Sequence, residues 1–567
     1  MMKFTKNIGA ALAALVLTTG FAVEALAFTN QVKVKEGTVQ GILDQKHNVM
    51  SWYGVPYAAP ALGENRWQAP AKAEKFKGVK DCTKPAPANI QFNGKKVLGQ
   101  EGALTLDICR PDTEETNLPV MVFFHGGNNQ TSNSRLWLGN KFAKEANVVY
   151  VSVQYRLGLF GFNNLPALAD GDKYTDGGNY GLVDQAAALE WVQKNITRFG
   201  GNPDNITVSG FSAGGRDVMA MLISPLFKDK FHKAISFSGG LTVADPAKSQ
   251  RVIAKALAPL AVADGVAADE KAAVDLLLSQ NKKDKKMVRQ YLDKIEAERL
   301  APLMAGALIR MSAFPHLYAD DKLLPKEGFA TKKYNSVPII MLASSDEFSS
   351  FVARDKYFKN RLDQIGKDKT TTDEFVYANK YGSLFYGYFN GQESAEGIYA
   401  NYKSPIYVCT FDFGHTSDVV GEAYSRRNGA FHGVFLPFLT DQPYPFYKGT
   451  NGFASEGAKA LSKAFIGSLG NFMRTGDPNH KLLQQTWQPW NPDYRPELVF
   501  DAGEASTRIY SINSRVSYAG LLAELEADKS PISDASRAYM NKYVFNGRWF
   551  SEGLDKHFGN EDLWPQE

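Results

Sequence analysis

A serine in a glycine-rich turn is the residue of this chain whose surroundings most clearly suggest chemistry. Ser212 lies in the segment ITVSGFSAGGRDV, after an apolar run and before the helical pattern RDVMAMLISP. A G-x-S-x-G turn between a strand and a helix holds the serine hydroxyl in a strained, exposed position, from which it can attack a carbonyl carbon. Gly210 and Gly214 allow the sharp turn and the close packing of strand and helix. We therefore predict that Ser212 is a nucleophile.

A serine nucleophile needs a general base, and the base needs an acid that orients it. Of the eight histidines, His432 fits best, because it lies in the small-residue turn NGAFHGVFLPFL late in the chain. Its position matches the order serine, acid, histidine that is typical of such turns. The acid is expected at a strand end between the two, where VPIIMLASSDEF offers Asp346 and Glu347. The residues alone leave the choice between these two carboxylates open.

The oxyanion of an acyl-transfer transition state needs N–H donors that are already in place, and the loss of one costs roughly 2.7–4 kcal/mol. The residue after the nucleophile, Ala213, supplies one such N–H. The segment HGGNN follows the apolar strand PVMVFF, which is the context of an oxyanion loop. We predict that Gly127 and Asn128 supply the other donors. This chemistry requires no cofactor and no metal.

The elements that must position these residues are strands alternating with helices. Six apolar, β-rich runs recur, at 118–127, 147–156, 205–212, 232–240, 336–345 and 404–413. Between the second and the third, GLVDQAAALEWVQKNITRFGG has helical spacing and is stopped by Gly200 and Gly201. Continuous apolar strands alternating with helices indicate a mostly parallel sheet covered on both faces. We predict an α/β fold in one domain over residues 28–567.

Two stretches are predicted to be helical insertions. Residues 246–312 are rich in Ala, Lys and Leu at helical spacing, and residues 353–403 are helical and aromatic. Insertions on this architecture usually gather above the carboxyl ends of the strands, where ligands bind. The basic run KKDKK at 282–286 is best explained as a solvated helix face or turn.

The first 27 residues have the pattern of a signal peptide. Lys3 and Lys6 precede an apolar core, and Ala25-Leu26-Ala27 forms an A-x-A cleavage site. We therefore expect residues 1–27 to be removed and the mature chain to be exported, into the periplasm or the medium. The apolar run is too short for a stable membrane anchor.

The overall charge argues against two classes of partner. The formal net charge is +4 at pH 7, and it falls to about +3 without the signal peptide. Such a small excess does not predict nucleic acid or an anionic membrane as a partner. Small molecules are the expected ligands, and the sequence leaves the oligomeric state open.

These motifs extend into a resemblance that covers nearly the whole chain. The chain resembles the type B carboxylesterases, the family within the α/β-hydrolase fold that includes the cholinesterases. Its most specific part is GNYGLVDQAAALEWVQKNITRFGGNPDNITVSGFSAGG at 178–215, and the segments at 53–70, 153–162 and 471–479 also match. The resemblance implies a central, mostly parallel mixed sheet flanked by helices, with helical insertions over the active site.

The resemblance also implies roles for individual residues. It makes Ser212 the nucleophile and His432 the base, and it selects Glu347 over Asp346 because the family uses the second residue of this pair. Gly127, Asn128 and Ala213 would then form the oxyanion hole. The implied reaction is acyl transfer to water through an acyl-enzyme.

Several positions depart from the pattern of the family. Asn128 replaces the third glycine of the oxyanion loop, and Asn tolerates positive φ better than most residues. Its side-chain amide would add a donor or narrow the acyl entrance. The family usually has a cysteine at Ala103, bonded to the equivalent of Cys82, whereas here Cys109 lies six residues further, roughly 20 Å along an extended strand. This spacing disfavours a substitute bridge, because bonded cysteines have Cα atoms within about 7 Å.

The departure next to the nucleophile bears on the substrate, because the family usually has glutamate where Phe211 stands. Phe211, Phe348 and Phe431 are candidate pocket residues, and Tyr386 and Tyr388 are further ones. Together they predict small to medium, neutral apolar or aromatic esters and poor selectivity for choline-like esters.

Two alternatives to a soluble esterase remain at this stage. A lipase of the same family is one, although no strongly amphipathic lid stands out in the sequence. A catalytically silent recognition domain of the cholinesterase type is the other, and it is disfavoured because such domains lose the serine or the histidine that this chain retains.

Overall fold

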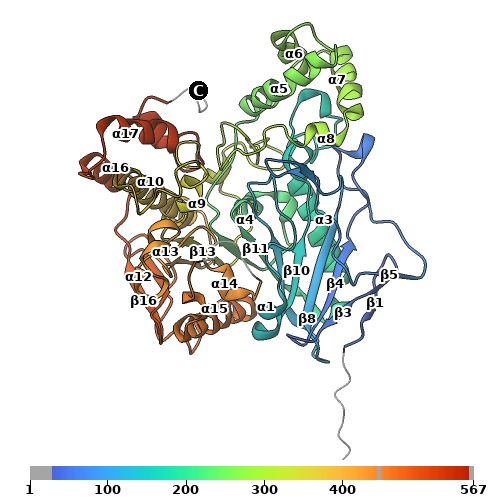
Figure 1. Ribbon diagram of the computed structural model, residues 1–567. Helices are drawn as coiled ribbons and strands as arrows, with labels where there is room; N and C mark the ends of the chain where they lie inside the picture. The colour runs from blue at the N-terminus through green and yellow to red at the C-terminus, as the bar shows by residue number, and fades with distance from the viewer. Residues whose placement is uncertain (1–27, 443–448, 561–567) are drawn as a thin grey trace, which may run out of the picture.

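The computed structural model describes residues 28–442 and 449–560, and its centre is an 11-stranded mixed sheet (Figure 1). The strand order is β16-β15-β14-β13-β12-β11-β9-β10-β8-β4-β3. Every pairing from β10 through β15 is parallel, and the pairings at both ends of the sheet are antiparallel. The predicted α/β-hydrolase fold, with a mostly parallel mixed sheet flanked by helices, is confirmed. The strands of this sheet are β3 (Ile42–Asp44), β4 (Val49–Pro56), β8 (Thr105–Pro111), β9 (Leu118–Phe124), β10 (Val149–Val153), β11 (Gly201–Phe211), β12 (Lys233–Phe237), β13 (Ile339–Ser344), β14 (Ile406–Phe411), β15 (Pro496–Ala502) and β16 (Thr507–Asn513).

The six predicted runs are the six strands β9 to β14. Every residue of β9, β10, β12 and β13 is buried, as expected for parallel strands covered on both faces. The outer strands β3, β4, β8, β15 and β16 were not predicted. β16 is mostly exposed and carries few apolar residues, so it lacks the continuous apolar signal of the central strands.

Helices cover both faces of the sheet, as β9 shows. Val120 and Val122 belong to the core that includes α3 and α4, whereas Met121 and Phe123 belong to the core that includes α1 and α15. The predicted helix after the second strand is present, and Gly200 ends its final 3₁₀ turn with a φ of +75°. The helices next to the sheet are α1 (Asn140–Ala146), α3 (Tyr180–Asn195), α4 (Ala213–Ile223) and α15 (Glu456–Thr475).

Both predicted insertions contain helices. The first contains α5 (Pro246–Ala263), α6 (Glu270–Leu277), α7 (Lys282–Lys294) and α8 (Ala297–Leu300), which stand together at one corner of the molecule (Figure 1). The KKDKK run is the first turn of α7, and its lysines are exposed or half-buried. The second contains α10 (Lys369–Tyr388), a π-helical turn (Phe389–Glu393) and α11 (Ser394–Tyr399).

The C-terminal part of the chain packs against the second insertion. Aromatic residues of α10 share a core with the segment around Phe545, Trp549 and Phe550. In Figure 1, α16 and α17 lie beside α10 at the upper left. The helices of this part are α16 (Tyr518–Ala527), α17 (Asp534–Tyr539) and α18 (Glu552–His557), and the short ones before it are α2 (Gly158–Gly161), α9 (Ser349–Val352), α12 (Ser417–Val420), α13 (Glu422–Arg427) and α14 (Leu436–Leu439). The remaining strands form two small sheets, β1 (Gln31–Lys33), β2 (Thr38–Gln40) and β5 (Val79–Asp81) in one, β6 (Gln91–Phe92) and β7 (Val97–Leu98) in the other.

All three cysteines are free thiols buried in the fold, so the structure contains no bridge between Cys82 and Cys109. Burial raises the pKa of the Cys82 thiol to about 11, which keeps it protonated at neutral pH. The predicted signal peptide lies outside the described residues. Within residues 28–442 and 449–560, no helix has the length and hydrophobicity needed to cross a membrane.

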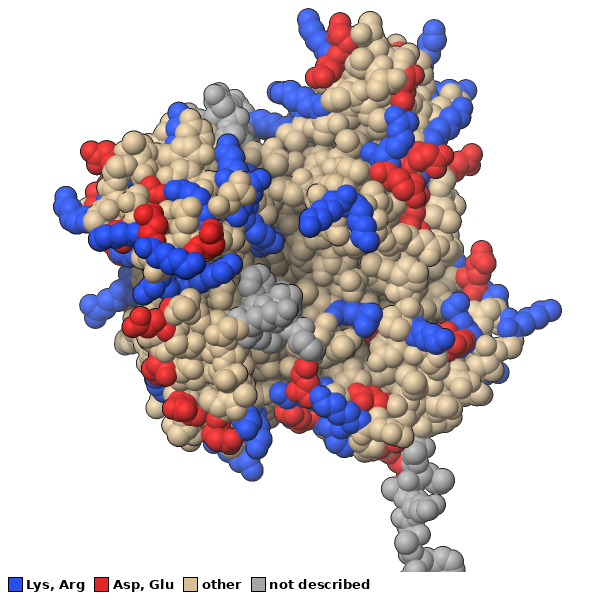
Figure 2. Space-filling model, in the orientation of Figure 1, with Lys and Arg blue, Asp and Glu red and all other residues tan. Residues whose placement is uncertain are grey.

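The surface carries both signs of charge. Figure 2 shows acidic and basic side chains interspersed over one face of the molecule. This face is hollowed between the part that carries α16 and α17 and the rest of the fold, and Lys and Arg side chains stand on both sides of the hollow (Figure 2).

Candidate active site

Ser212 lies in a tight turn between β11 and α4. Its backbone has a φ of +58° and a ψ of −116°, a strained conformation for a residue with a side chain. Glycines make the turn possible, because a Cβ atom on Gly210 would stand 2.1 Å from the carbonyl oxygen of Gly214. The Ser212 N–H donates to the carbonyl oxygen of Phe237 on the neighbouring strand β12 at 2.8 Å. The hydroxyl is thereby held at the carboxyl end of the sheet.

His432 lies in a loop that faces this turn. Its Nδ1 contacts Oε2 of Glu347, which follows β13 and is fully buried. Its Nε2 is buried and has no hydrogen-bond partner in the described part of the chain. The ring of Phe211 lies 4.7 Å from the imidazole, between ring centroids, so the loop meets the turn that carries Ser212.

The second oxygen of Glu347 is bound by residues that sequence reasoning missed. Ser238 donates its hydroxyl to Oε1 at 2.5 Å, and the N–H of Ser344 donates to the same oxygen at 2.9 Å. Ser238 follows β12 as Ser212 follows β11, and the two strands pair in parallel with Phe211 opposite Phe237. The sequence contained one sign of this contact, since Ser238 directly follows a strand in AISFSGG, as Ser212 does in its own turn.

Asp346 has a different task from its neighbour Glu347. Its carboxylate accepts the N–H of Ala430 at 2.8 Å, and its own N–H donates to the carbonyl oxygen of Ala430 at 2.9 Å. Asn379 and His415 also bind this carboxylate, at 3.2 and 2.9 Å. The attraction of Asp346 raises the pKa of His415 to about 9. Asp346 therefore fastens the loop two residues before His432.

The oxyanion loop has left-handed backbone at its key positions. Gly127 has a φ of +100° and Asn128 a φ of +58°, so Asn128 adopts the conformation expected of it. Within the described residues, the N–H groups of Gly127, Asn128 and Ala213 donate to no acceptor. A Cβ atom on Gly126 would stand 2.9 Å from Cβ of Ser212, so this loop passes directly beside the turn. Three unused N–H donors are thus available near the serine.

A buried polar network fixes the oxyanion loop. Asn129 donates to Asp217 at 2.8 Å and accepts from the Tyr155 hydroxyl at 2.9 Å. Gln185 donates to the second oxygen of Asp217 at 2.7 Å. Burial raises the pKa of Asp217 to about 6. His125 is also buried and stacks on Tyr155 with ring centroids 4.6 Å apart.

The side-chain amide of Asn128 is not available as an extra donor to the oxyanion. Its Nδ2 donates to Oε1 of Gln130 at 3.1 Å, and its Oδ1 accepts from Arg216 at 3.1 Å. Both ends of the amide are therefore engaged, and the backbone N–H is the group of Asn128 that remains available.

Aromatic rings surround the imidazole of His432. The rings of Phe211, Phe351 and Tyr386 lie 4.7, 5.2 and 5.7 Å from it, between centroids. Phe211 also packs edge-on against Phe435 at 5.3 Å. Phe351 was not among the predicted pocket residues. The imidazole thus lies among aromatic rings, with its only described hydrogen bond to Glu347.

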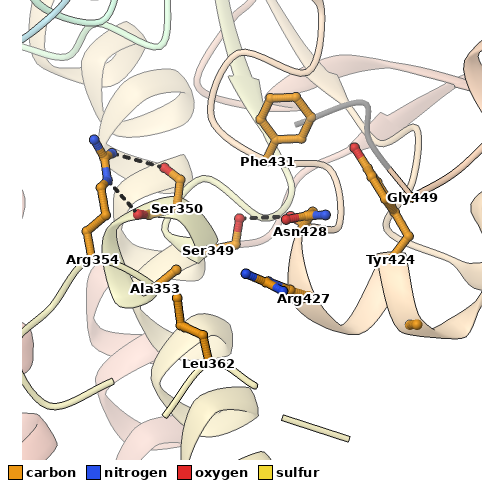
Figure 3. A pocket seen from close by; sticks show the side chains of 11 residues that line it. Ser349, Ser350, Ala353, Arg354, Leu362, Tyr424, Arg427, Asn428, Phe431 and Gly449 are labelled. Atoms are coloured by element: carbon orange, nitrogen blue, oxygen red, sulfur yellow. Dashed lines mark hydrogen bonds between the residues drawn. The ribbon is translucent and has the colours of Figure 1, made fainter. Parts of the chain in front are cut away.

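The other two predicted pocket phenylalanines belong to different clusters of the core. Phe348 is buried in the aromatic core that includes Phe545 and Phe550. Phe431 lines a cavity of about 530 Å³ between α9 and α13 (Figure 3). Tyr388, a further candidate, is also largely buried. The other residues lining this cavity are Ser349, Ser350, Ala353, Arg354, Leu362, Ala423, Tyr424, Arg427, Asn428 and Gly449.

The arrangement has the parts required for acyl transfer. It holds a strained serine, an imidazole oriented by a buried carboxylate, and N–H donors beside the serine. Such a set can form a covalent acyl intermediate and stabilise the oxyanion that precedes it.

Known proteins resemble this chain over most of its length. The carboxylesterase family model matches residues 29–402. The para-nitrobenzyl esterase of Bacillus subtilis (strain 168) is 29% identical over 498 residues, 83% of this chain and 94% of that protein. The liver carboxylesterase of Sus scrofa is 37% identical over 491 residues, 77% of this chain and 82% of that protein. A solved PNB esterase structure has a TM-score of 0.62 at 26% identity, over 85% of this chain and 97% of that one.

Proposed function

We propose that this chain, which belongs to the carboxylesterase family and is a carboxylic ester hydrolase, cleaves its substrates through an acyl-enzyme on Ser212. In this proposal His432 is the general base and Glu347 orients it. The observation that carries the proposal is the hydrogen bonding of the two ring nitrogens of His432. Its Nδ1 is held by a buried carboxylate, while its Nε2 is unpartnered beside the turn of the serine.

The proposed reaction has two halves. Oγ of Ser212 attacks the ester carbonyl carbon and passes its proton to Nε2 of His432. The negative oxygen of the tetrahedral intermediate accepts the N–H groups of Gly127, Asn128 and Ala213. The C–O bond to the alcohol then breaks, and the alcohol leaves with the proton from Nε2. Water then attacks the acyl carbon and gives a proton to Nε2 of His432. The bond between this carbon and Oγ of Ser212 breaks, the acid leaves, and Nε2 returns the proton to Oγ.

The substrates proposed are small to medium esters with apolar or aromatic groups. Phe211, Phe351 and Tyr386 support this, because they surround the imidazole with aromatic surface. Phe211 also places no negative charge next to the nucleophile, so the turn has no anion that would attract a cationic group. Among the relatives, the Bacillus subtilis protein is named for para-nitrobenzyl esters, which are aromatic.

Export through a cleaved signal peptide is also part of the proposal. The A-x-A site at 25–27 would leave Phe28 as the first residue. Phe28 already packs on Trp52, with ring centroids 6.1 Å apart, and its N–H donates to Asp112 at 3.0 Å. N-terminal sequencing of the exported protein should therefore begin at Phe28.

A labelling experiment tests the assignment of the nucleophile. A fluorophosphonate probe should label folded protein on the peptide that contains Ser212, and the Ser212→Ala variant should remain unlabelled. His432→Ala should remove nearly all turnover of p-nitrophenyl acetate without unfolding the protein. Labelling on another serine, or full turnover in His432→Ala, would refute the assignment.

A substrate panel tests the preference. The ratio kcat/KM should be higher for short aliphatic and aromatic esters than for long-chain esters. A steep rise in rate above the solubility limit of a long-chain ester would instead indicate a lipase.

A further inference from the structure

A buried arginine lies beside the proposed catalytic residues, and no carboxylate in the described part of the chain pairs with it. Arg216 is four residues after Ser212 on α4, and only 1% of it is exposed. Its Nη2 donates to Oδ1 of Asn128 at 3.1 Å and lies 3.4 Å from Nε2 of His316. Its Nε and Nη1 are buried and have no hydrogen-bond partner within residues 28–442 and 449–560. The guanidinium thus has two unused donor nitrogens.

The neighbours of Arg216 also contact the proposed oxyanion hole and the imidazole of His432. Asn128 belongs to the oxyanion loop, and the Tyr386 hydroxyl is the titratable group that acts most strongly on the guanidinium. The ring of Tyr386 stacks on the imidazole of His432, and its buried hydroxyl faces the guanidinium. Trp549, from the C-terminal part of the chain, covers the guanidinium at 3.8 Å from its ring centroid.

Within residues 28–442 and 449–560, no neighbour neutralises this charge through an ion pair. The carboxylate of Asp217, the next residue, is bound by Asn129 and Gln185 instead. His316 is buried too, and burial together with the nearby guanidinium lowers its pKa well below the usual range, so it stays neutral. Burial lowers the pKa of Arg216 itself to about 10, which still leaves it charged at neutral pH. A buried cation of this kind is costly unless an anion joins it.

We propose that Arg216 recognises a carboxylate on the acyl part of the ester, so that the site favours esters of dicarboxylic acids with one free acid group. The acyl part is the relevant one, because Arg216 contacts Asn128, whose N–H would bind the acyl carbonyl oxygen. A guanidinium with free donors forms charge-assisted hydrogen bonds to carboxylates. The inference rests on the proposed function and changes one point in it, since the preferred apolar ester would be anionic rather than neutral.

Two esters with the same leaving group and the same chain length test the inference. Mono-4-nitrophenyl adipate carries a free carboxylate, and methyl 4-nitrophenyl adipate carries a neutral methyl ester in its place. The wild-type protein should give a higher kcat/KM for the first ester than for the second. One charge-assisted hydrogen bond is expected to change this ratio by about 10- to 100-fold.

Variants then assign the preference to one side chain. Arg216→Met should lower the anionic-to-neutral ratio by about 10-fold or more, and Arg216→Lys should retain part of it. Arg110→Met is the matched control, because Arg110 is equally buried but donates to backbone carbonyl groups in another part of the fold. The anionic-to-neutral ratio of Arg110→Met should equal that of the wild type. Adipate itself should inhibit the wild type more strongly than Arg216→Met.

The outcomes separate the inference from the function on which it rests. A wild type that hydrolyses the neutral ester but prefers it to the anionic one would overturn the inference and leave the esterase intact. An equal loss on both esters in folded Arg216→Met would show that Arg216 only positions Asn128, which also overturns the inference. No turnover of either ester by wild type would instead refute the proposed function. If Arg216→Met does not fold, the wild-type ratio and the same measurements on Arg216→Lys still decide.

Discussion

His125 gives the oxyanion loop a defined sensitivity to acid. The residue is 1% exposed, stacks on Tyr155 and donates from Nδ1 to the carbonyl oxygen of Gly126 at 2.9 Å. Burial lowers its pKa from 6.5 to about 4. Between these two pH values the unfolded chain binds a proton at this site and the native protein does not, so the free energy of unfolding falls as the pH falls.

The size of the effect follows from the two pKa values. At pH 5 the site should lower the free energy of unfolding by about 2 kcal/mol relative to pH 7. Asp217 opposes this, because a carboxyl group whose pKa is raised to about 6 favours the folded state as the pH falls. His316 acts in the same direction as His125, since its pKa is also lowered by burial. The pH dependence of the free energy of unfolding is therefore the sum of several contributions. The contribution of His125 is obtained as the difference between wild type and a variant that lacks this histidine.

Two substitutions isolate it. His125→Phe keeps a ring on Tyr155, and His125→Asn keeps a hydrogen-bond donor, but neither titrates. Urea unfolding followed by tryptophan fluorescence gives the free energy of unfolding at both pH values. The loss on acidification should be about 2 kcal/mol smaller in both variants than in wild type. An equal loss in all three proteins would refute the assignment of a buried neutral histidine.

Three further predictions concern the residues that hold His432. Glu347→Gln should lower kcat on p-nitrophenyl acetate by about 10⁴-fold, because an amide cannot accept from both Ser238 and His432 and also stabilise the imidazolium; a loss below tenfold would contradict the role. Ser238→Ala should lower kcat about 10-fold or more, through loss of a hydrogen bond to a charged group, and should leave KM nearly unchanged; a change in KM alone would count against it. Charged His415 attracts Asp346, a contribution fully present below pH 6.5 and lost as the pH rises through about 9. Between pH 6.5 and about 9, the thermal midpoint of wild type should therefore fall more than that of His415→Gln, and parallel curves would exclude this pair.

The sequence predicted the parts of the site that depend on local patterns. Ser212 in its turn, the donors after β9 and the central strands all have signals within a few residues. Because carboxyl ends of parallel strands meet at one edge of a sheet, the strand assignments alone bring Ser212 and the acid segment together. The choice between Asp346 and Glu347 was not available from the residues, since both follow the same strand. In the structure the two side chains diverge, one to the loop at Ala430 and the other to His432.

The contacts that the sequence did not predict join segments that are far apart in the chain. Ser238 reaches Glu347 because of the register among β11, β12 and β13, and no periodicity in one strand reveals a register. Trp549 covers Arg216 because the C-terminal part packs on α10, a tertiary arrangement with no local signature. The edge strand β16 was missed for a related reason, since its residues are less continuously apolar than those of the buried centre.

Two residues on either side of Ser212 act on substrate charge in the same direction. Phe211 occupies the position before the nucleophile with an uncharged ring that packs on His432. Arg216, one helical turn after Ser212, adds a buried cation that no described carboxylate pairs with. The first removes an attraction for cationic groups, and the second adds a repulsion that a low-dielectric site strengthens. Substrate charge should therefore order the rates as anionic, then neutral, then cationic. Choline-like esters are placed last by both residues independently, so restoring a glutamate at Phe211 alone would not make them good substrates while Arg216 remains.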